Sequence, residues 1–514
     1  MRQNGSQDEH RRHAPLQGRW PTLIGAIALL CAQTLPLTGQ TAAQENLVQQ
    51  VQHLTEAMSR TQARLEESQH ELEEMRQQLA TLQKQMAEGG SGTTPGAAEP
   101  SAAAQLAAQV DELREQQGLQ ESQITTQDQA KVESESKYPV KVSGLILLNG
   151  FANTQKVDIA ATPSVAVGGS GSTGLSLLQT VLGLDARGPH LFGARSHADV
   201  RVDFDGGSAP GGYTGSYSNN VGLLRLRTAH AALDWKNTEA FFSLDRPIVS
   251  PNTPSSLTAV AVPALAWSGN LWAWNPQLGV THDLSLSSSL RVRMQAALID
   301  VSDAPFLFNA AMTTTSGATN AEQSRRPGVE TRLALLDGSK ESGAQLGFGG
   351  YFAPHRTSFG TSFDAWAGTL DYRQPLPARL EFSGSAYRGQ SLGGLGGGAF
   401  KDYAYYFDGQ ESYFRALDDV GGWAQLKEKT SERLEFNAAF GIDNVPGGQL
   451  RPYAGAYSAA YQNLARNRTY TGNVIYSPSA YLLFSLEYRR LESSPVNSPT
   501  AGSNVIGLGA GYKF

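Results

Sequence analysis

The spacing of apolar residues changes once along the chain, from a helical repeat to a strict alternation. Between residues 47 and 86, one position recurs at alternating steps of four and three and is apolar except at Thr61 and Ser68. Glu, Gln, Arg and Lys fill the positions between, so a single apolar stripe would run along a solvated helix. Such a stripe predicts a coiled coil, which needs partner chains to bury it. The stripe consists of Leu47, Val51, Leu54, Met58, Thr61, Leu65, Ser68, Leu72, Met75, Leu79, Leu82 and Met86.

From Val140 onward the pattern has a period of two, which predicts β-strands with one polar and one apolar face. Residues 194–205 carry Arg, His or Asp at nearly every second position, beginning with Arg195, and mostly apolar residues between them. Residues 290–299 and 480–491 repeat the alternation. These segments are about 10 to 12 residues long, the length that a tilted strand needs to cross a membrane.

Turn-forming residues divide this region into strands joined alternately by short turns and long loops. Short turns are expected at 235–238, 337–340 and 477–479, and long loops rich in Gly, Ser and Pro at 159–193, 247–276, 302–326 and 389–416. The pattern yields about fifteen candidate strands, and because single-chain bacterial barrels have even strand numbers, about sixteen are expected. A barrel of that size leaves an aqueous channel through its centre.

The predicted fold is therefore mainly β, a transmembrane antiparallel β-barrel over residues 138–514 preceded by an α-helical coiled coil. A soluble sandwich is the alternative, because it would bury the apolar strand faces in a core. Charges along the polar faces and aromatic residues near strand ends favour the barrel. No segment beyond the N-terminus offers the ~18 apolar residues of a spanning helix.

The first 43 residues have the organisation of a secretory signal peptide. Arg2, Arg11, Arg12 and Arg19 precede the apolar run 23–30, and small residues at 41–43 offer a cleavage site. A short membrane anchor is the alternative interpretation. Cys31 follows Leu30, where a lipoprotein signal needs a small residue, so lipidation is not expected. The coiled coil would then occupy 44–88, and a Gly/Ser-rich flexible linker with a short helix 89–137.

Composition narrows the functional class. Of the 514 residues 40% are apolar, the net charge is −6, and Cys31 is the one cysteine. A nucleic-acid binder would show a basic excess, so nucleic acid is not an expected partner. No catalytic triad, phosphate-binding Gly-rich loop or metal-ligating His spacing stands out along the sequence, with His197, His230 and His282 in predicted strands. Neither an enzyme nor a bound cofactor or metal is expected.

Several short motifs resemble the DcaP-like family of trimeric outer-membrane porins. They are Val142-Ser143-Gly144 leading to Asn149-Gly150-Phe151, then Leu224-Arg225-Leu226-Arg227-Thr228 through Ala240-Phe241-Phe242, and Asp245-Arg246-Pro247. The resemblance covers most of residues 47–514. It implies a homotrimer of sixteen-stranded pores that favours small anionic solutes such as dicarboxylates.

Basic side chains on the polar strand faces are the candidates for lining such a pore and favouring anions. Rings of Arg or Lys lower the electrostatic barrier to anions at a constriction. The candidates are Arg195, Arg201, Arg225, Arg227, Arg291 and Arg293. Alternatively, these residues only pair with Asp199, Asp203 and Asp205 and solvate the interior.

The loop after Arg246 is the candidate constriction. It carries several prolines and then Trp267, Trp272 and Trp274. A rigid aromatic loop is suited to folding inward and narrowing a channel. An outward loop, with its aromatics at the lipid interface or a trimer contact, is the alternative.

The C-terminus carries a candidate membrane-insertion signal. Phe514 is the last residue, and Tyr512 and further apolar residues precede it at alternate positions. This pattern resembles the signal by which the barrel-assembly machinery recognises outer-membrane barrels. The expected location is the bacterial outer membrane, with lipid around the barrel and the coiled coil in the periplasm. The alternative function is a structural envelope tether with a periplasmic rod and no open pore.

Overall fold

The computed structural model describes residues 139–206, 222–305, 317–337, 343–454 and 463–514. The chain divides into two units, Met1–Glu115 and Gln116–Phe514, and all described residues belong to the second. The predicted signal peptide, coiled coil and linker lie outside the described residues.

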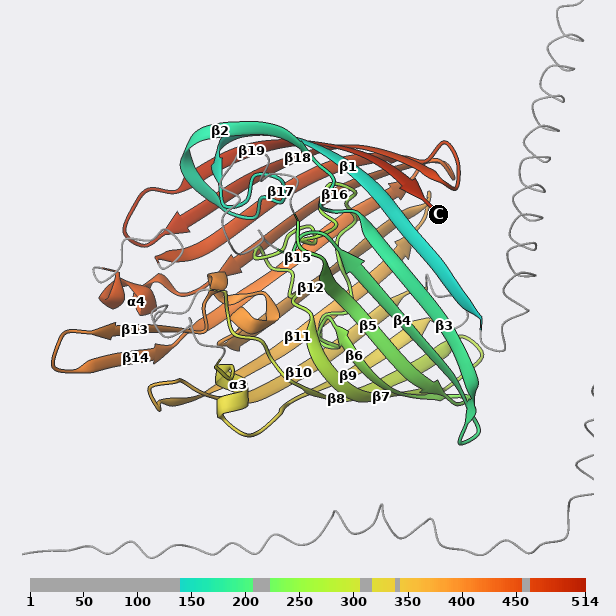
Figure 1. The fold of residues 1–514 in the computed structure, drawn as a ribbon, viewed down its shortest axis with the longest axis horizontal. Helices are drawn as coiled ribbons and strands as arrows, with labels where there is room; N and C mark the ends of the chain where they lie inside the picture. The colour runs from blue at the N-terminus through green and yellow to red at the C-terminus, as the bar shows by residue number, and fades with distance from the viewer. Residues whose placement is uncertain (1–138, 207–221, 306–316, 338–342, 455–462) are drawn as a thin grey trace, which may run out of the picture. The chain divides into compact units, whose positions relative to one another are not determined.

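Long antiparallel strands form one sheet that closes on itself (Figure 1). Its first strands are β1 (Val140–Val157), β2 (Ala166–Ser176), β3 (Val181–Leu191), β4 (Ala194–Asp203), β5 (Arg225–Asp234), β6 (Thr238–Asp245), β7 (Asn275–Ser285), β8 (Leu290–Ile299) and β9 (Gly328–Asp337). The remainder are β10 (Gln345–Arg356), β11 (Ser362–Leu376), β12 (Leu380–Gln390), β15 (Asp418–Lys429), β16 (Leu434–Asn444), β17 (Leu464–Tyr476), β18 (Leu482–Pro495) and β19 (Ala501–Lys513).

The barrel closes between its first and last strands, and it has sixteen positions. β1 pairs with β19 from Leu145↔Lys513 to Asn153↔Val505. On its other edge, β1 pairs with β3 along its first residues and with β2 along its later ones. Because β2 and β3 share one position, the seventeen strands of the sheet make a sixteen-stranded barrel. This confirms the predicted antiparallel β-barrel and its strand number.

The predicted loop at 159–193 is wrong, because most of that segment forms β2 and β3. β2 reads Ala-Val-Gly-Gly-Ser-Gly-Ser-Thr-Gly-Leu-Ser, so Gly and Ser hide the alternation by which the other strands were found. Its ladder to β1 supplies the backbone hydrogen bonds that make it a strand despite this composition. β2 and β3 together supply the barrel position that the sequence-based count of about fifteen strands lacked.

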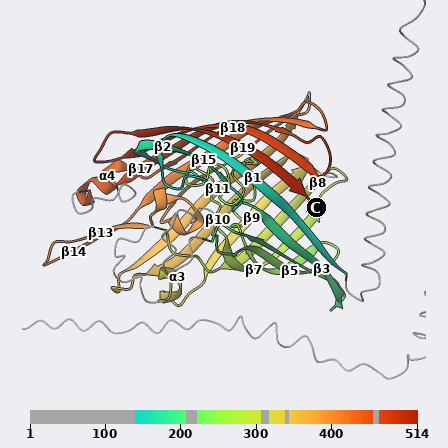
Figure 2. The ribbon, with the colours of Figure 1, turned by 45° about the horizontal axis from the view of Figure 1, so that its top comes forward.

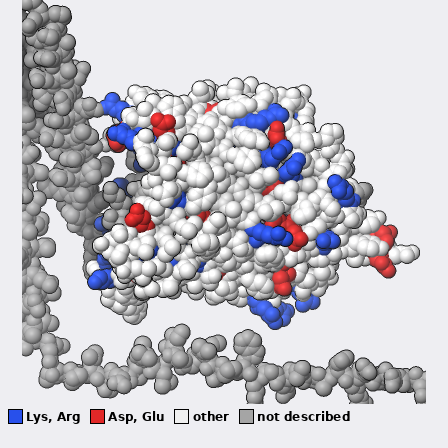
Figure 3. All heavy atoms as spheres, turned by 180° about the vertical axis from the view of Figure 1, so that it is seen from behind, with Lys and Arg blue, Asp and Glu red and all other residues white. Residues whose placement is uncertain are grey.

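The two faces of the barrel wall differ as the alternation predicted. On β18 the side chains of Leu482, Phe484, Leu486 and Tyr488 point outward and are 40–51% exposed, whereas Glu487 points inward and is 1% exposed. Exposed Leu, Val and Phe recur in the same way on the other long strands. On the face shown in Figure 3, a broad uncharged area separates charged groups gathered at either end. An apolar outer band of this kind suits contact with lipid tails.

The connections differ in length at the two ends of the barrel (Figure 2). One end carries short turns, such as the one between β5 and β6. The other carries the long loops, which hold α3 (Asn320–Gln323), α4 (Gly447–Leu450), the 3-10 turns Gly393–Leu395, Gly398–Phe400 and Arg451–Tyr453, and the hairpin β13 (Tyr403–Phe407) and β14 (Ser412–Ala416). Within the described residues, no helix has both the length and the apolar character to cross a bilayer.

Candidate functional site

The segment between β6 and β7, residues 246–274, lies inside the barrel and is called the inner loop here. Its hydrogen bonds reach strands around the wall: Asn149 Nδ2 on β1 donates to Leu257 O (3.2 Å), Thr369 Oγ1 on β11 to Val249 O (2.8 Å), Ser255 N to Gln425 Oε1 on β15 (2.6 Å) and Arg489 Nη2 on β18 to Thr258 Oγ1 (2.8 Å). Contacts this far apart around the wall require the loop to cross the interior.

Local sequence explains why the inner loop can follow this path. Prolines at 247, 251, 254 and 263 hold the backbone in fixed conformations and remove N–H donors that would need partners. Gly269 has φ +94°, and a Cβ there would lie 2.1 Å from the carbonyl oxygen of Gly422 on β15. Only glycine permits that approach of loop to wall. Leu265 and Trp267, both with φ near 60°, add two left-handed positions.

The three tryptophans of the predicted constriction form a chain of ring contacts. Trp267 stacks on Phe400 with ring centroids 4.1 Å apart. Trp267 and Trp272 then meet edge to face at 5.8 Å, as do Trp272 and Trp274 at 5.4 Å. The Trp274 ring lies under the guanidinium groups of Arg225 and Arg227, at 5.1 and 5.0 Å. These ring contacts thus link the loop that holds Phe400 to basic residues of β5.

The loop from Ser391 to Leu417, between β12 and β15, packs against the inner loop through Phe400. Its Lys401 is fully buried, and the Nζ atom donates to the carbonyl oxygens of Ala399 (2.6 Å) and Leu464 (2.8 Å). Burial lowers the pKa of Lys401 to about 7, although the carboxylates of Asp443 and Asp419 act in the opposite direction. These contacts fix the second loop to the wall at β17.

All six candidate arginines lie on one stretch of wall, β4, β5 and β8, and five of them are close to carboxylates. Arg225 makes a two-pronged contact with Asp203 at 2.9 and 2.7 Å, and Arg293 makes one with Asp283 at 2.8 Å for both bonds. The other pairs are Arg201–Asp185 (2.5 Å), Arg201–Asp199 (3.7 Å), Arg225–Asp205 (4.0 Å), Arg227–Asp203 (3.7 Å) and Arg291–Asp283 (3.4 Å). Pairing with acidic residues, the alternative raised from the sequence, is thus present.

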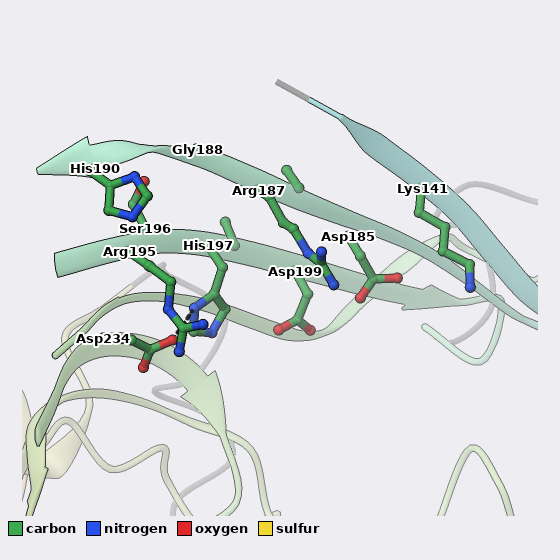
Figure 4. Close-up of a pocket in the computed structure, with 12 residues that line it drawn as sticks. Lys141, Asp185, Arg187, Gly188, His190, Arg195, Ser196, His197, Asp199 and Asp234 are labelled. Atoms are coloured by element: carbon green, nitrogen blue, oxygen red, sulfur yellow. Dashed lines mark ion pairs between the residues drawn. The ribbon is translucent and has the colours of Figure 1, made fainter. Parts of the chain in front are cut away.

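Arg195 differs from the other five, because within the described residues no carboxylate lies within ion-pair distance of it. It lines a pocket of about 730 Å³ with residues of β1, β3, β4 and β5, among them Lys141, Arg187 and Asp199. Figure 4 shows these side chains projecting from neighbouring strands into one space, with Arg195 beside His197 and Asp234.

The paired arginines of β4, β5 and β8 are partly accessible to water. The paired arginine side chains are 19–36% exposed. On the opposite wall, Asp371, Asp419 and Asp443 point inward but are at most 1% exposed. There the inner loop and the Ser391–Leu417 loop cover the strands. The pocket of about 730 Å³ lies on the arginine-bearing side, against β1, β3, β4 and β5.

Two buried guanidinium nitrogens near the Trp274 ring have no hydrogen-bond partner among the described residues. They are the Nη1 atoms of Arg227 and of Arg246, the first residue of the inner loop. The Nη1 atom of Arg227 lies 3.7 Å from Oδ2 of Asp203, within ion-pair distance but too far for a hydrogen bond. Arg246, predicted to belong to the constriction, is thus placed close to the arginines of β5.

The C-terminal residues continue the outer face of the barrel. Tyr512 and Phe514 are 49% and 42% exposed, and their rings stack at 6.5 Å. Phe514 also exchanges two backbone hydrogen bonds with Gly144 on β1, at 3.0 and 3.1 Å. A side chain at Gly144 would collide with the Phe514 ring, because a Cβ there would lie 2.6 Å from it.

Sequence reasoning missed several inward-facing partners. Asp185 lies in the segment taken for a loop, so its pairing with Arg201 was hidden. Asp283 was detectable, because β7 alternates Gln277, Gly279 and Thr281 with outward Leu278 and Val280. The pair of Arg332 and Asp371 joins β9 to β11 across β10, which no local pattern reveals.

A closed sixteen-stranded barrel, an apolar outer band and a polar interior crossed by one loop define the fold of an outer-membrane channel of the porin type. Among solved structures, the outer membrane channel DcaP of Acinetobacter baumannii has this fold, with a TM-score of 0.53 and 16% identity over 74% of this chain and 99% of that chain. An anion-selective porin from Comamonas acidovorans aligns over 74% of this chain and 100% of that chain, with 10% identity and a TM-score of 0.42. No family model and no curated protein matches the sequence.

Proposed function

We propose that this chain is a porin through which small hydrophilic solutes diffuse, with a preference for dicarboxylate-like anions. The observation that carries the proposal is the asymmetry of the interior. The inner loop covers one wall, so a solute would pass along the other, and all six candidate arginines stand on that wall.

The carboxylates on the same wall reduce its positive charge but do not remove its capacity to bind anions. Asp283 faces both Arg291 and Arg293, so that group retains net positive charge, whereas Arg225 and Arg227 are balanced by Asp203 and Asp205. Arg195, which has no carboxylate within ion-pair distance among the described residues, lines the pocket of about 730 Å³ and offers guanidinium donors to a passing carboxylate. Donors occur at several positions along this wall, so they could bind both carboxylates of one dicarboxylate.

The inner loop supplies the narrow place that selectivity requires. Charges on a wall act on a solute only over a short distance in water, about 1 kcal/mol for unit charges 4 Å apart. By filling the space against β9 to β18, the loop brings every solute close to β4 and β5. Trp274, the last residue of the inner loop, lies against Arg225 and Arg227 and would form part of the boundary of the solute path.

The remaining parts of the proposal concern assembly. The heptad pattern at 44–88 needs partner chains without fixing their number, and the resemblance to trimeric porins supports a homotrimer with a periplasmic coiled coil. Phe514 and Tyr512 would present the outer-membrane insertion signal to the barrel-assembly machinery after export by the signal peptide. The interior arrangement suits passive diffusion, so we propose a channel rather than an enzyme.

Replacing both Arg225 and Arg227 with Gln tests the role of the arginine wall. The expected result is a reversal potential, under a salt gradient in planar bilayers, that moves toward cation preference. Loss of one charge about 4 Å from the solute path costs about 1 kcal/mol, roughly a fivefold fall in local anion occupancy. Arg379→Gln, in the exposed turn between β11 and β12, is the matched control and should leave the potential unchanged. An unchanged potential in the double variant would refute a selective role for these arginines.

A further inference from the structure

We propose that His197, His230 and Glu239 form a binding site for a divalent transition-metal ion, with Zn²⁺ as the preferred ion, on the inner wall of the barrel. Each residue offers one ligand atom, and these atoms all lie within 4.8 Å of one another. Two imidazole nitrogens and one carboxylate oxygen are a ligand set that zinc accepts, with a further position left for water. Arg195, one of the arginines of the proposed anion path, lines the same pocket as His197.

Strand register brings the three residues together, although their spacing along the sequence matches no metal-ligand motif. His230 on β5 pairs with Asp199 on β4, which places His197 diagonally beside it on the same face. Glu239 on β6 pairs with Asp234 on β5. The cluster therefore lies near the short-turn end of the barrel, and its three side chains come from three adjacent strands.

The ring of His230 is held in place from both sides. It stacks on His197 with centroids 5.7 Å apart and on the buried Phe241 at 5.3 Å. Its Nε2 atom lies 2.9 Å from Oε1 of Glu239. Ligand atoms of a tetrahedral zinc ion at about 2.1 Å lie roughly 3.4 Å apart, so a separation of 4.8 Å would need to shorten by about 1.4 Å. Glu239, whose side chain has the most rotatable bonds of the three, would make most of that movement.

Asp234 supports a metal-binding orientation of His197. Its Oδ2 atom lies 3.1 Å from Nδ1 of His197. An imidazole whose Nδ1–H points to a carboxylate keeps its lone pair on Nε2, and metal-ligating histidines commonly show this arrangement. The pairing fixes both the tautomer and the ring plane. Asp234 would thus be a positioning residue for the ion without touching it.

An ion from solution can reach the cluster. His197 and Asp234 line the pocket of about 730 Å³ in Figure 4, and the side chains of His230 and Glu239 are 23% and 30% exposed. Carboxylates of Asp199 and Asp234 in the same pocket offset the positive charge of Arg195. A bound ion would occupy space on the water-filled side of the interior, so it would reduce the ionic current.

Zinc binding to the full chain purified in detergent is the direct test. Equilibrium dialysis against ZnCl₂ should show one more ion per chain for the unaltered protein than for His230→Ala or Glu239→Gln. Glu239→Gln keeps the size of the side chain and a hydrogen-bonding group, so it guards against loss of folding. Heat-modifiable migration on gels monitors the folding of each variant. Asp234→Asn should weaken binding by about 10–100-fold.

His282→Ala is the matched control, because His282 lies in the neighbouring β7 and its Nδ1 atom contacts Thr238 Oγ1 at 2.7 Å, outside the cluster. It should bind as many ions as the unaltered protein. Equal binding by the unaltered protein and by folded His230→Ala and Glu239→Gln would overturn the proposal.

A bilayer recording separates this proposal from the proposed function. Micromolar Zn²⁺ should reduce the single-channel current of the unaltered protein and not that of His230→Ala. If zinc binds with the expected dependence on the cluster but no current is ever seen, the metal site stands and the porin proposal fails. If the channel conducts and the cluster binds no zinc, the metal site fails and the porin proposal stands.

Discussion

At the scale of single residues, the interior combines apolar clusters around the two loops with polar groups that hydrogen-bond to one another. Arg332 is the clearest case. Its Nε and Nη2 atoms donate to the two carboxylate oxygens of Asp371 at 2.7 Å, and its Nη1 atom donates to Gln295 at 2.8 Å. Gln345 also donates to Asp371, at 2.6 Å. Charges buried this deeply are tolerated only when every partner is present.

Arg332→Ala should therefore destabilise the barrel by about 3–5 kcal/mol, because it leaves the Asp371 carboxylate buried without its partner. Urea unfolding of the protein in lipid vesicles would measure the loss. Arg356→Ala, which removes an exposed arginine at the end of β10, should change stability by no more than about 0.5 kcal/mol. A loss at Arg332 no larger than at Arg356 would show that water or local movement replaces the pair.

At the scale of elements, a strand could be predicted from the sequence only where its polar and apolar side chains alternate strictly. β4, β8 and β18 carry charged or polar side chains on one face and apolar ones on the other, so both their existence and their inward faces could be predicted. β2 could not, because Gly and Ser carry no such signal and its conformation depends on pairing with β1. The hairpin of β13 and β14 was also missed within the predicted loop 389–416, since it pairs only with itself.

The position of the inner loop could be predicted in part. Its prolines and tryptophans suggested a rigid inward segment, but its contacts with β1, β11, β15 and β18 depend on which strands lie opposite. The metal-ligand cluster was missed for the same reason. His197, His230 and Glu239 have no ligand spacing along the sequence, and only the register of three strands brings them together.

Trp267→Ala should loosen the contact between the inner loop and the Ser391–Leu417 loop, because the stacking of Trp267 on Phe400 is lost. We expect a higher and noisier single-channel conductance, and a loss of stability of about 3–5 kcal/mol. Trp366→Ala removes an outward-facing tryptophan and should leave the conductance unchanged. Identical conductance in both variants would argue against a narrowing role for the inner loop.

Deleting Phe514 should lower the amount of assembled barrel in the outer membrane, since the residue ends β19 and hydrogen-bonds to Gly144 at the closure of the barrel. The fraction of heat-modifiable protein in isolated outer membranes would measure the effect. Phe484→Ala offers a comparison with a phenylalanine of similar outward exposure, 44% against 42%. Equal assembly of both variants would count against an insertion signal at the C-terminus.

At the scale of the whole molecule, one barrel presents an apolar outer face, a wall of paired arginines and a loop that covers the opposite wall. The outer face places the barrel in lipid, and the interior decides what passes. The proposed function therefore depends on the interior, where a plugged barrel serving as an envelope tether and an open anion channel would differ.

Single-channel recording of the purified protein in planar bilayers, with the reversal potential under a salt gradient, tests the central claim most directly. We expect conductance steps in groups of three and a reversal potential of the sign that anion preference gives. Absence of current from folded, heat-modifiable protein would contradict the open channel and favour the tether, and a cation-selective current would contradict the role assigned to the arginine wall.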